Sequence, residues 1–294
     1  MKGELVKVIT ADGLELKGFF SDQKSDVAVF HSHGTAGDFY THEFVEVEGN
    51  KLAKEKISFL TANNRGHDVT TDIRKHKNGK VEWTQVGGGK ERFEDCLLDI
   101  DAWINFLIKR GVKKIILQSH SLTQKILYYQ YKKSNKKVVG QIHLSPCNDA
   151  GLMQSILGEK KYIETNKMIA KIIKMRKDKT KLPDELSVVC QMNALAYSGY
   201  LVEEGEGNLF PYHNTQSKKW IVLEKAKEPL LAIFGGADIY IKPSNEIAAN
   251  LFKLKAKSSK NITTKIIKDA SHSYLDFERE LVDVIFSWIK DNYL

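Results

Sequence analysis

The chain has 294 residues, 42% of them hydrophobic, and a formal net charge of +8. That length and apolar content suffice for a substantial core in one large domain or two modest ones, which excludes a disordered chain. The first residues lack the apolar stretch of a signal peptide, and no apolar run approaches the roughly 18 residues that a membrane span requires. We therefore expect a globular, cytoplasmic protein without a membrane span.

The basic excess is concentrated in one stretch of the chain. Residues 160–181 contain eight Lys and one Arg against two acidic residues. Ile169, Ile172 and Ile173 lie in this stretch with the spacing of a helix that buries one face. We interpret the stretch as a solvated basic helix face and expect no nucleic-acid partner, while a basic surface can also attract an anionic substrate.

Neither the cysteines nor the histidines indicate a metal site. Cys96, Cys147 and Cys190 are widely spaced and form no C-x-x-C pair, so we expect buried, reduced thiols rather than a disulfide framework or a zinc cluster. His31 and His33 have no carboxylate cluster beside them. We therefore expect no metal.

Short apolar runs bounded by turn residues predict strands along most of the chain. The first two flank the turn Ala11-Asp12-Gly13 and predict an antiparallel hairpin. Several later runs are almost wholly apolar, as expected for strands that helices cover on both faces. The expected strands are Leu5–Ile9, Leu14–Phe20, Val27–His31, Ile57–Ala62, Lys114–Leu117, Val138–Leu144, Leu230–Phe234 and Thr263–Ile267.

Helical spacing alternates with these runs. Such alternation predicts an α/β fold with a mostly parallel, doubly wound sheet. The Asn78-Gly79 turn predicts a small additional hairpin. The expected helices are at about Glu43–Lys56, Glu91–Arg110, Leu122–Lys133, Pro243–Lys257 and Phe277–Asn292.

The alternation is interrupted between about residues 148 and 226. This segment is helix-like and rich in turns, has no clear strand and can scarcely form a core of its own. We therefore predict one core domain, residues 1–147 and 227–294, and an inserted helical lid, residues 148–226, that shapes a pocket and excludes water. Apolar residues of the insertion are candidate pocket walls, although residues of these types more often only pack in a core: Tyr162, Met168, Met175, Phe210 and Tyr212.

A serine stands where one predicted strand turns into a helix. The apolar run Ile115-Ile116-Leu117 is followed by "QSHSLT", in which Ser121 is the second serine, and helical spacing then begins at once. Such a turn lifts its residue above the carboxyl edge of the sheet, where a nucleophile can meet a substrate. The stretch resembles the nucleophile elbow of the α/β-hydrolase family, G-x-S-x-G, with Ser119 and Thr123 in place of the glycines.

This resemblance implies partners for Ser121. The stretch "LLAIFGGADIYIKP" resembles the late strand and loop that carry the family's acid, which is Asp238 here. The stretch "TTKIIKDASHSYLDFE" resembles the loop that carries the catalytic histidine, which is His272. The order Ser, Asp, His is that of the family. Asp149 follows another predicted strand, from which some members supply the carboxylate, and is the alternative acid.

The stretch "VAVFHSHGTAG" resembles the family's HG motif. The resemblance implies an oxyanion hole made by the backbone N–H groups of Thr35 and Leu122. His33 and Gly34 would position the loop that carries Thr35, and His120 would pack beside the nucleophile. The stretch "TANNRGHD" resembles a turn with a structural role in the family.

The resemblance covers nearly the whole chain outside the insertion and implies a serine hydrolase of the carboxylesterase or thioesterase type. Ser121 would attack an ester, thioester or amide carbonyl, His272 would accept its proton, and water would release the acyl group. No cofactor is implied. The stretches "ERFEDCLLDIDAWINFL", "SHSLTQKILYYQ" and "LSPCNDAG" resemble the subgroup that contains siderophore-type esterases. We expect a medium-sized acyl ester as substrate, with an anionic group as one option.

Two other functions fit the same motifs. Ser119 and Thr123 at the glycine positions favour a non-catalytic ligand-binding protein of the same fold. An acyltransferase would use the same triad with an acceptor other than water.

Overall fold

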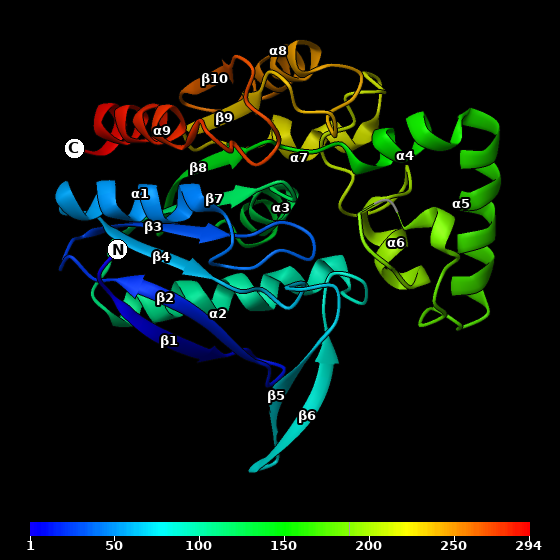
Figure 1. The fold of residues 1–294 in the computed structure, drawn as a ribbon, viewed down its shortest axis with the longest axis horizontal. Helices are drawn as coiled ribbons and strands as arrows, with labels where there is room; N and C mark the ends of the chain where they lie inside the picture. The colour runs from blue at the N-terminus through cyan, green and yellow to red at the C-terminus, as the bar shows by residue number, and fades with distance from the viewer. Residues whose placement is uncertain (188) are drawn as a thin grey trace.

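The computed structural model describes residues 1–187 and 189–294, and a central sheet of eight strands organises its fold (Figure 1). The strand order is β1-β2-β4-β3-β7-β8-β9-β10, with β1 and β2 antiparallel to their neighbours and the other pairs parallel. The sheet strands are β1 (Glu4–Ile9), β2 (Glu15–Ser21), β3 (Val27–Ser32), β4 (Ser58–Ala62), β7 (Lys114–His120), β8 (Val138–Leu144), β9 (Leu230–Gly235) and β10 (Ile262–Ile267).

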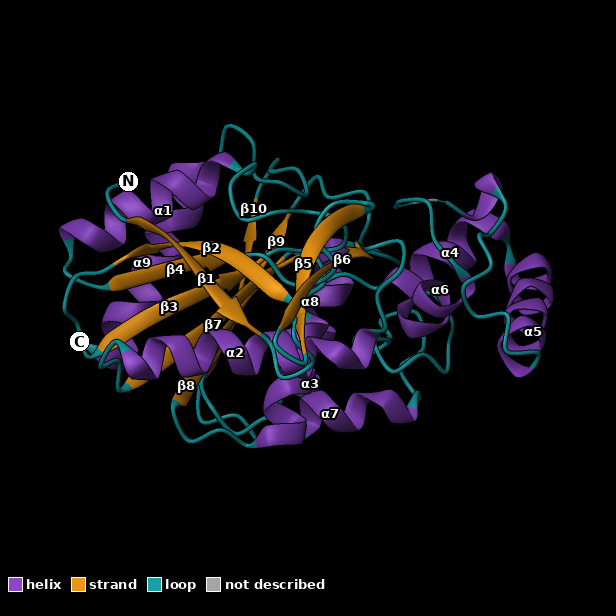
Figure 2. Ribbon diagram, turned by 90° about the horizontal axis from the view of Figure 1, so that it is seen from below, coloured by secondary structure: helices purple, strands orange, loops and turns teal. Residues whose placement is uncertain are grey.

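Helices cover both faces of this sheet, as Figures 1 and 2 show. α1 and α9 pack together on one face, and α2 and α3 lie on the other. The expected doubly wound, mostly parallel sheet is confirmed. The helices are α1 (Glu43–Lys54), α2 (Cys96–Lys109), α3 (Gln124–Lys133), α4 (Asp149–Leu157), α5 (Glu159–Lys174), α6 (Ala194–Tyr200), α7 (Ile221–Glu224), α8 (Asn245–Lys255) and α9 (Glu278–Tyr293).

The apolar composition of the strands follows from this layering. In β9 every residue is buried. Leu231 and Ile233 pack into the cluster under α1 and α9, whereas Ala232 and Phe234 face the cluster that includes α8. Because alternate side chains of a strand point to opposite faces, a strand that helices cover on both sides can be apolar at every position.

Several element boundaries differ from the sequence prediction. α2 begins at Cys96 rather than at Glu91, after a short 3₁₀ turn at Phe93–Asp95. Two further differences lie around Ser121. β7 continues to His120, so Ser119 and His120 belong to the strand rather than to the turn. α3 begins at Gln124, two residues later than expected. The strand-to-helix connection therefore consists of Ser121, Leu122 and Thr123.

A separate hairpin of β5 (Thr71–Lys77) and β6 (Lys80–Val86) projects from the molecule at the bottom of Figure 1. Its turn residues Asn78 and Gly79 have φ values of +50° and +74°. Two positive φ values in a two-residue loop are typical of the hairpin turn that Asn-Gly favours. The predicted hairpin is thus confirmed.

The insertion leaves the sheet after β8 and returns at β9, two strands that pair directly with each other. Its described residues contain α4, α5, α6 and α7 and no strand of the central sheet. α5 carries much of the basic stretch, with Ile169 buried and its lysines exposed. That helix has the solvated basic face expected from the sequence. Figure 1 places α4, α5 and α6 beside the sheet, at the right of the molecule.

Two buried cations join segments that are distant in sequence. Arg65 contacts the carboxylates of Asp12, Asp95 and Asp99 at 2.8–3.1 Å. Lys125 in α3 contacts Glu91 at 2.8 Å, and both side chains are only 1% exposed. Buried charges persist only when they are paired, so Arg65 fixes the loop after β4 against α2, and Lys125 fixes α3 against the segment that precedes α2.

Within residues 1–187 and 189–294, no helix is both long enough and apolar enough to cross a membrane.

Candidate active site

Ser121 occupies a strained turn at the carboxyl end of β7. Its φ is +64°, a region that residues with a side chain rarely adopt. The turn is held in place because the Ser121 N–H donates to the carbonyl of Leu144 at 2.9 Å, and the Ser121 carbonyl accepts from Thr123 at 2.8 Å and from Cys147 at 3.2 Å. Strain of this kind at a strand-to-helix turn is what a nucleophile elbow requires.

The positions usually taken by glycine in this turn hold buried hydroxyl residues. Ser119 and Thr123 are fully buried, and among the described residues neither hydroxyl has a hydrogen-bond partner. The turn therefore forms without glycine, at the expense of two unsatisfied polar groups.

Gly34 lies directly against Ser121. A Cβ atom on Gly34 would stand 2.7 Å from the Cβ of Ser121 and 2.9 Å from the carbonyl oxygen of His120. Only glycine allows the loop after β3 to approach the serine this closely. His33 fixes this loop, since its Nδ1 contacts the Gly34 carbonyl at 2.7 Å and its Nε2 accepts from the Asn64 N–H at 3.1 Å. Burial lowers the pKa of His33 well below its usual value, which keeps the ring neutral.

Two backbone N–H groups are free near the serine. In the described part of the chain, neither the Thr35 N–H nor the Leu122 N–H donates to a protein acceptor. Thr35 and Ser121 line the same cavity, and Leu122 follows Ser121 directly. An unsatisfied N–H beside a cavity is available to an oxygen atom that carries negative charge.

His272 and Asp238 form a close pair. His272 Nδ1 lies 2.6 Å from Asp238 Oδ2, and the Asp238 side chain is fully buried. The other carboxylate oxygen accepts from the Tyr240 N–H at 2.9 Å. With its Nδ1–H donated to Asp238, the imidazole presents Nε2 as the free acceptor.

The backbone of His272 is anchored by its neighbours. Its carbonyl accepts from His120 Nε2 at 2.8 Å and from the Ser145 hydroxyl at 3.1 Å. His120 is buried beneath the cavity and its ring packs 4.9 Å from that of His272. Burial lowers the pKa of His120 well below its usual value. His120 therefore acts as a neutral support for the histidine loop.

The sulfur of Cys147 separates the serine from the histidine. Sγ of Cys147 lies 3.5 Å from Ser121 Oγ and 3.9 Å from His272 Nε2. Among the described residues, no hydrogen bond joins Ser121 Oγ directly to His272. Burial raises the pKa of the Cys147 thiol well above its ordinary value, so the group is a thiol and not a thiolate. Sequence reasoning placed Cys147 in the core and missed these two contacts.

Asp149, the alternative acid, makes no hydrogen bond to the imidazole of His272 among the described residues. It is the first residue of α4 and is 8% exposed, and His272 bonds to Asp238 instead. Burial raises the pKa of Asp149 to about 6.

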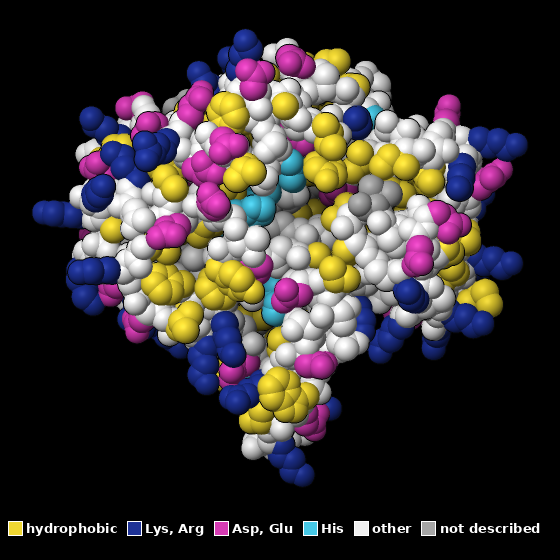
Figure 3. Space-filling view, in the orientation of Figure 1, with side chains coloured by type: hydrophobic (Ala, Val, Ile, Leu, Met, Phe, Trp, Pro, Cys, Tyr) yellow, Lys and Arg dark blue, Asp and Glu magenta, His cyan; other side chains and the backbone are white. Residues whose placement is uncertain are grey.

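These residues converge on a small cavity of about 200 Å³. Figure 3 shows histidine side chains beside a hollow near the middle of the molecule. Asp149 and Val189 reach the cavity from the insertion, whereas the candidate wall residues of the insertion do not line it. The cavity is lined by Gly34, Thr35, Gly37, His42, His120, Ser121, Cys147, Asp149, Val189, Tyr240 and His272.

The candidate wall residues lie elsewhere. Tyr162, Phe210 and Tyr212 are buried in the core, and Met168 and Met175 are exposed on the surface. None of the five lines the cavity, and the three aromatic side chains instead pack in the core, which is the more frequent role of such residues.

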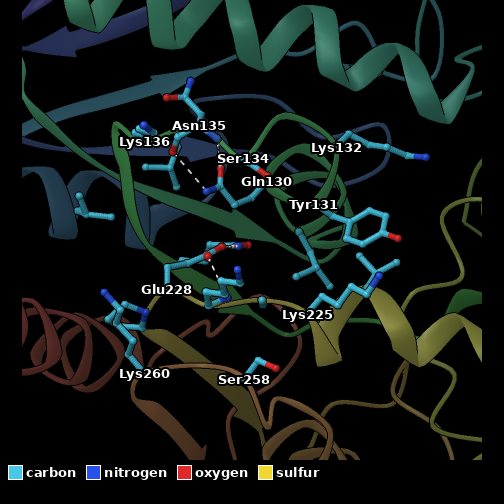
Figure 4. Close-up of a pocket in the computed structure, with 18 residues that line it drawn as sticks. Gln130, Tyr131, Lys132, Ser134, Asn135, Lys136, Lys225, Glu228, Ser258 and Lys260 are labelled. Carbon is cyan, nitrogen blue, oxygen red and sulfur yellow. Dashed lines mark hydrogen bonds between the residues drawn. The ribbon is translucent and has the colours of Figure 1, made fainter.

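A larger cavity of about 1150 Å³ lies at the opposite ends of β8 and β9, beside α3 and α7 (Figure 4). It contains none of the predicted site residues, and Lys132, Lys136, Lys225 and Lys260 are among its lining side chains. Chemistry rather than size therefore selects the smaller cavity as the candidate active site. In the described parts of the chain, no group of three or more His, Cys, Asp or Glu residues is arranged to hold a metal ion.

The chain has the α/β-hydrolase fold. Solved structures with the same fold include the esterase Pf2001 of Pyrococcus furiosus (TM-score 0.65, 16% identity, 99% of this chain and 91% of that chain). They also include the siderophore hydrolase EstB of Aspergillus fumigatus (TM-score 0.67, 17% identity, 99% of this chain and 98% of that chain). A third is Est1E of Butyrivibrio proteoclasticus with bound ferulic acid (TM-score 0.67, 14% identity, 98% of this chain and 99% of that chain).

Residues 87–290 match the model of the family described as a protein of unknown function, DUF1749, and the chain belongs to that family. No curated protein sequence shows significant similarity to the chain.

Proposed function

We propose that this protein is a serine hydrolase that cleaves an ester bond of a medium-sized acyl substrate, with Ser121, His272 and Asp238 as its triad. One observation carries the proposal. A serine in a strained strand-to-helix turn lines the same cavity as a histidine whose other ring nitrogen is bonded to a buried carboxylate. The named hydrolases of the same fold, esterases among them, support it as an analogy.

The proposed reaction begins at the hydroxyl of Ser121. His272 Nε2 accepts the hydroxyl proton as Oγ attacks the substrate carbonyl, and Asp238 orients the imidazole and stabilises its charged form. His272 then donates this proton to the leaving alcohol, which leaves an acyl group on Ser121. Water, deprotonated by the same nitrogen, attacks the acyl-enzyme and restores the serine.

The free N–H groups of Thr35 and Leu122 would stabilise the oxyanion formed in each attack. Their stabilisation acts mainly in the transition state because the substrate carbonyl oxygen gains its charge only there. Gly34 supports this role, since its missing side chain lets the Thr35 loop lie against the serine.

The reaction requires the serine and the histidine to come closer than they are without substrate. A rotation of the Ser121 side chain or of the Cys147 thiol would replace the two sulfur contacts by one Oγ to Nε2 hydrogen bond. Catalytic hydrogen bonds are often long in the free enzyme and shorten in the complex.

We assign the insertion the role of a lid. Asp149 and Val189 reach the cavity from this segment, so a change in its position would alter access to Ser121. A carboxyl group in the cavity disfavours an anionic substrate, which contrasts with the expectation drawn from the net charge.

The proposal is tested with a fluorophosphonate probe, which labels only an activated serine, and with p-nitrophenyl esters of short and medium chain length. We expect the wild-type protein to be labelled and to release nitrophenol. In Ser121→Ala we expect labelling to disappear and kcat to fall roughly 10⁴-fold or more. A folded wild-type protein that is neither labelled nor active on any of these esters would contradict the proposal.

A non-catalytic binding protein is the second candidate. It is favoured by the sulfur that separates Ser121 from His272 and by the absence, within the described residues, of a hydrogen bond between them. The same probe distinguishes the two, because a binding protein would fold and remain unlabelled.

A further inference from the structure

The carboxyl group of Asp149 is the acidic group of the cavity that the proposed mechanism does not use. The residue is 8% exposed and lines the cavity together with Ser121 and His272. Its Oδ2 is buried, and within the described residues that oxygen has no hydrogen-bond partner. A buried carboxyl oxygen without a partner is unfavourable unless a ligand supplies one.

The usual structural roles of an acidic residue at this position are filled by other groups. The first turn of α4 is capped by Asn148, whose side chain accepts from the Gly151 N–H at 2.9 Å. The imidazole of His272 is oriented by Asp238. Asp149 is therefore required neither as a helix cap nor as the triad acid.

The described lining of the cavity gives Asp149 no permanently charged cation, and His272 is already bonded to the carboxylate of Asp238. That lining contains no Lys or Arg, and its other ionisable side chains are His42, His120, Cys147, Tyr240 and His272. Burial lowers the pKa of His42 and that of His120, so neither ring supplies a positive charge near neutral pH. The carboxyl group of Asp149 thus favours a cation in the cavity.

We infer that Asp149 binds a protonated amine of the substrate, so that the preferred ester carries a primary ammonium group close to its scissile bond. An ammonium group offers three N–H donors and a positive charge, which match a carboxyl group without partners. The small cavity volume, about 200 Å³, requires the amine to be near the ester and not at the end of a long chain. This inference rests on the proposed hydrolase function.

The test uses two series of aryl esters of matched size. In one series a butyrate ester of a para-substituted phenol carries an aminomethyl, ethyl or carboxymethyl group. In the other series the esters are aryl benzoates, and the same substituents stand at the para position of the benzoyl group. Rigid para placement prevents the amine from attacking its own ester. We expect the wild-type protein to prefer the ammonium ester in at least one series, and to hydrolyse the carboxylate ester most slowly.

Asp149→Asn should reduce the ratio of kcat/KM for the ammonium ester to that for the neutral ester by about 10- to 100-fold, the usual contribution of a hydrogen bond to a charged group. Asp184→Asn is the matched control, because it removes the same charge from an exposed position of the insertion. That control should leave the ratio unchanged.

A second measurement needs no variant. Butylammonium should inhibit hydrolysis of the neutral ester competitively in the wild-type protein, and butyrate should do so much more weakly. The inference is overturned if the neutral ester is hydrolysed but neither the selectivity ratios nor the inhibition depend on charge. If the folded wild-type protein hydrolyses none of these esters, the proposed function itself is overturned.

Discussion

The sulfur of Cys147 lies 3.5 Å from the hydroxyl oxygen of Ser121 and 3.9 Å from the Nε2 atom of His272. The residue is 2% exposed, and its S–H also reaches the Ser145 carbonyl at 3.4 Å. A thiol makes only weak hydrogen bonds, so little free energy would be lost if the sulfur moved aside to let Ser121 bond to His272.

Replacement of Cys147 by alanine should therefore preserve the chemistry. We expect Cys147→Ala to be labelled by the fluorophosphonate probe and to keep kcat within about tenfold of the wild-type value, since only weak contacts are lost. Steady-state kinetics on a p-nitrophenyl ester and the labelling reaction measure this. If Cys147→Ala loses activity while Ser121→Ala retains it, Cys147 and not Ser121 is the nucleophile.

Replacement of Asp238 by asparagine should leave the fold intact and impair the reaction. An amide in place of the carboxylate favours the wrong imidazole tautomer and no longer stabilises the imidazolium, which lowers kcat by roughly 10³- to 10⁴-fold in triads of this type. Asp149→Asn provides the comparison and should lose far less. Equal losses in the two variants, measured with a neutral ester, would return Asp149 to consideration as the acid.

Replacement of Gly34 by alanine should displace the serine. The added Cβ would meet the Ser121 Cβ at 2.7 Å and the backbone carbonyl oxygen of His120 at 2.9 Å, so the serine turn or the Gly34 loop must shift. A shift of the catalytic atoms by about 1 Å reduces the rate of a positioned reaction by about 100-fold. We expect kcat to fall by that factor while the circular dichroism spectrum remains that of the wild-type protein. Unchanged kinetics in Gly34→Ala would show that the serine can occupy another position and still react.

Glu48 should make the stability of the protein depend on pH. Its carboxyl group is buried in α1, accepts from Gln118 at 2.7 Å, and has a pKa raised by burial to about 8 from an ordinary value of 4.5. The folded protein therefore binds a proton that the unfolded chain releases, and the resulting stabilisation is lost as pH rises from about 4.5 through 8.

The variant Glu48→Gln should remove this dependence. We expect its free energy of unfolding to rise relative to that of the wild-type protein by about 1.4 kcal/mol for each pH unit within this window, with little difference near pH 4.5. Urea unfolding at several pH values provides the measurement. A constant difference across the window would show that Glu48 is ionised in the folded protein.

Removal of Lys125 should destabilise the fold. Its Nζ contacts both oxygens of Glu91 at 2.8 and 2.9 Å and the Asn64 side chain at 3.1 Å, with both charges buried. Loss of one member of such a pair typically costs about 3–5 kcal/mol, because the other charge remains without a partner. Lys125→Met should show this loss in thermal unfolding.

A double replacement, Lys125→Met with Glu91→Gln, should recover most of the lost stability, and Lys132→Met on the exposed part of α3 is the control for the helix. A double variant as unstable as the single one would assign the loss to packing instead of charge.

Much of the fold could be predicted from local patterns. The runs that became β3, β4 and β9 are buried at every position, and their largely apolar composition identifies them in the sequence. The Asn78-Gly79 turn and the basic face of α5 also have signatures within a few residues. The boundaries around Ser121 could not be read this way, because Ser119 and His120 are polar residues in a buried strand.

The candidate site was predicted in part. Ser121, Asp238 and His272 lie in turns that follow strands, and parallel strands bring such turns to one edge of the sheet. The Cys147 contacts, the unpartnered oxygen of Asp149 and the Lys125 to Glu91 pair depend on side-chain packing between segments far apart in sequence. No spacing in the sequence encodes those distances.

The chain leaves the sheet after Leu144 and returns to it at Leu230, on two strands that pair directly with each other. The positions of the strands therefore do not depend on the segment between them. The register of the sheet is set by that pairing, so residues can be added to or removed from the intervening segment without shifting any strand. The helical segment can thus vary during evolution while Ser121, Asp238 and His272 keep their places on the scaffold. Related chains could in this way acquire new substrates by exchanging one continuous piece of sequence.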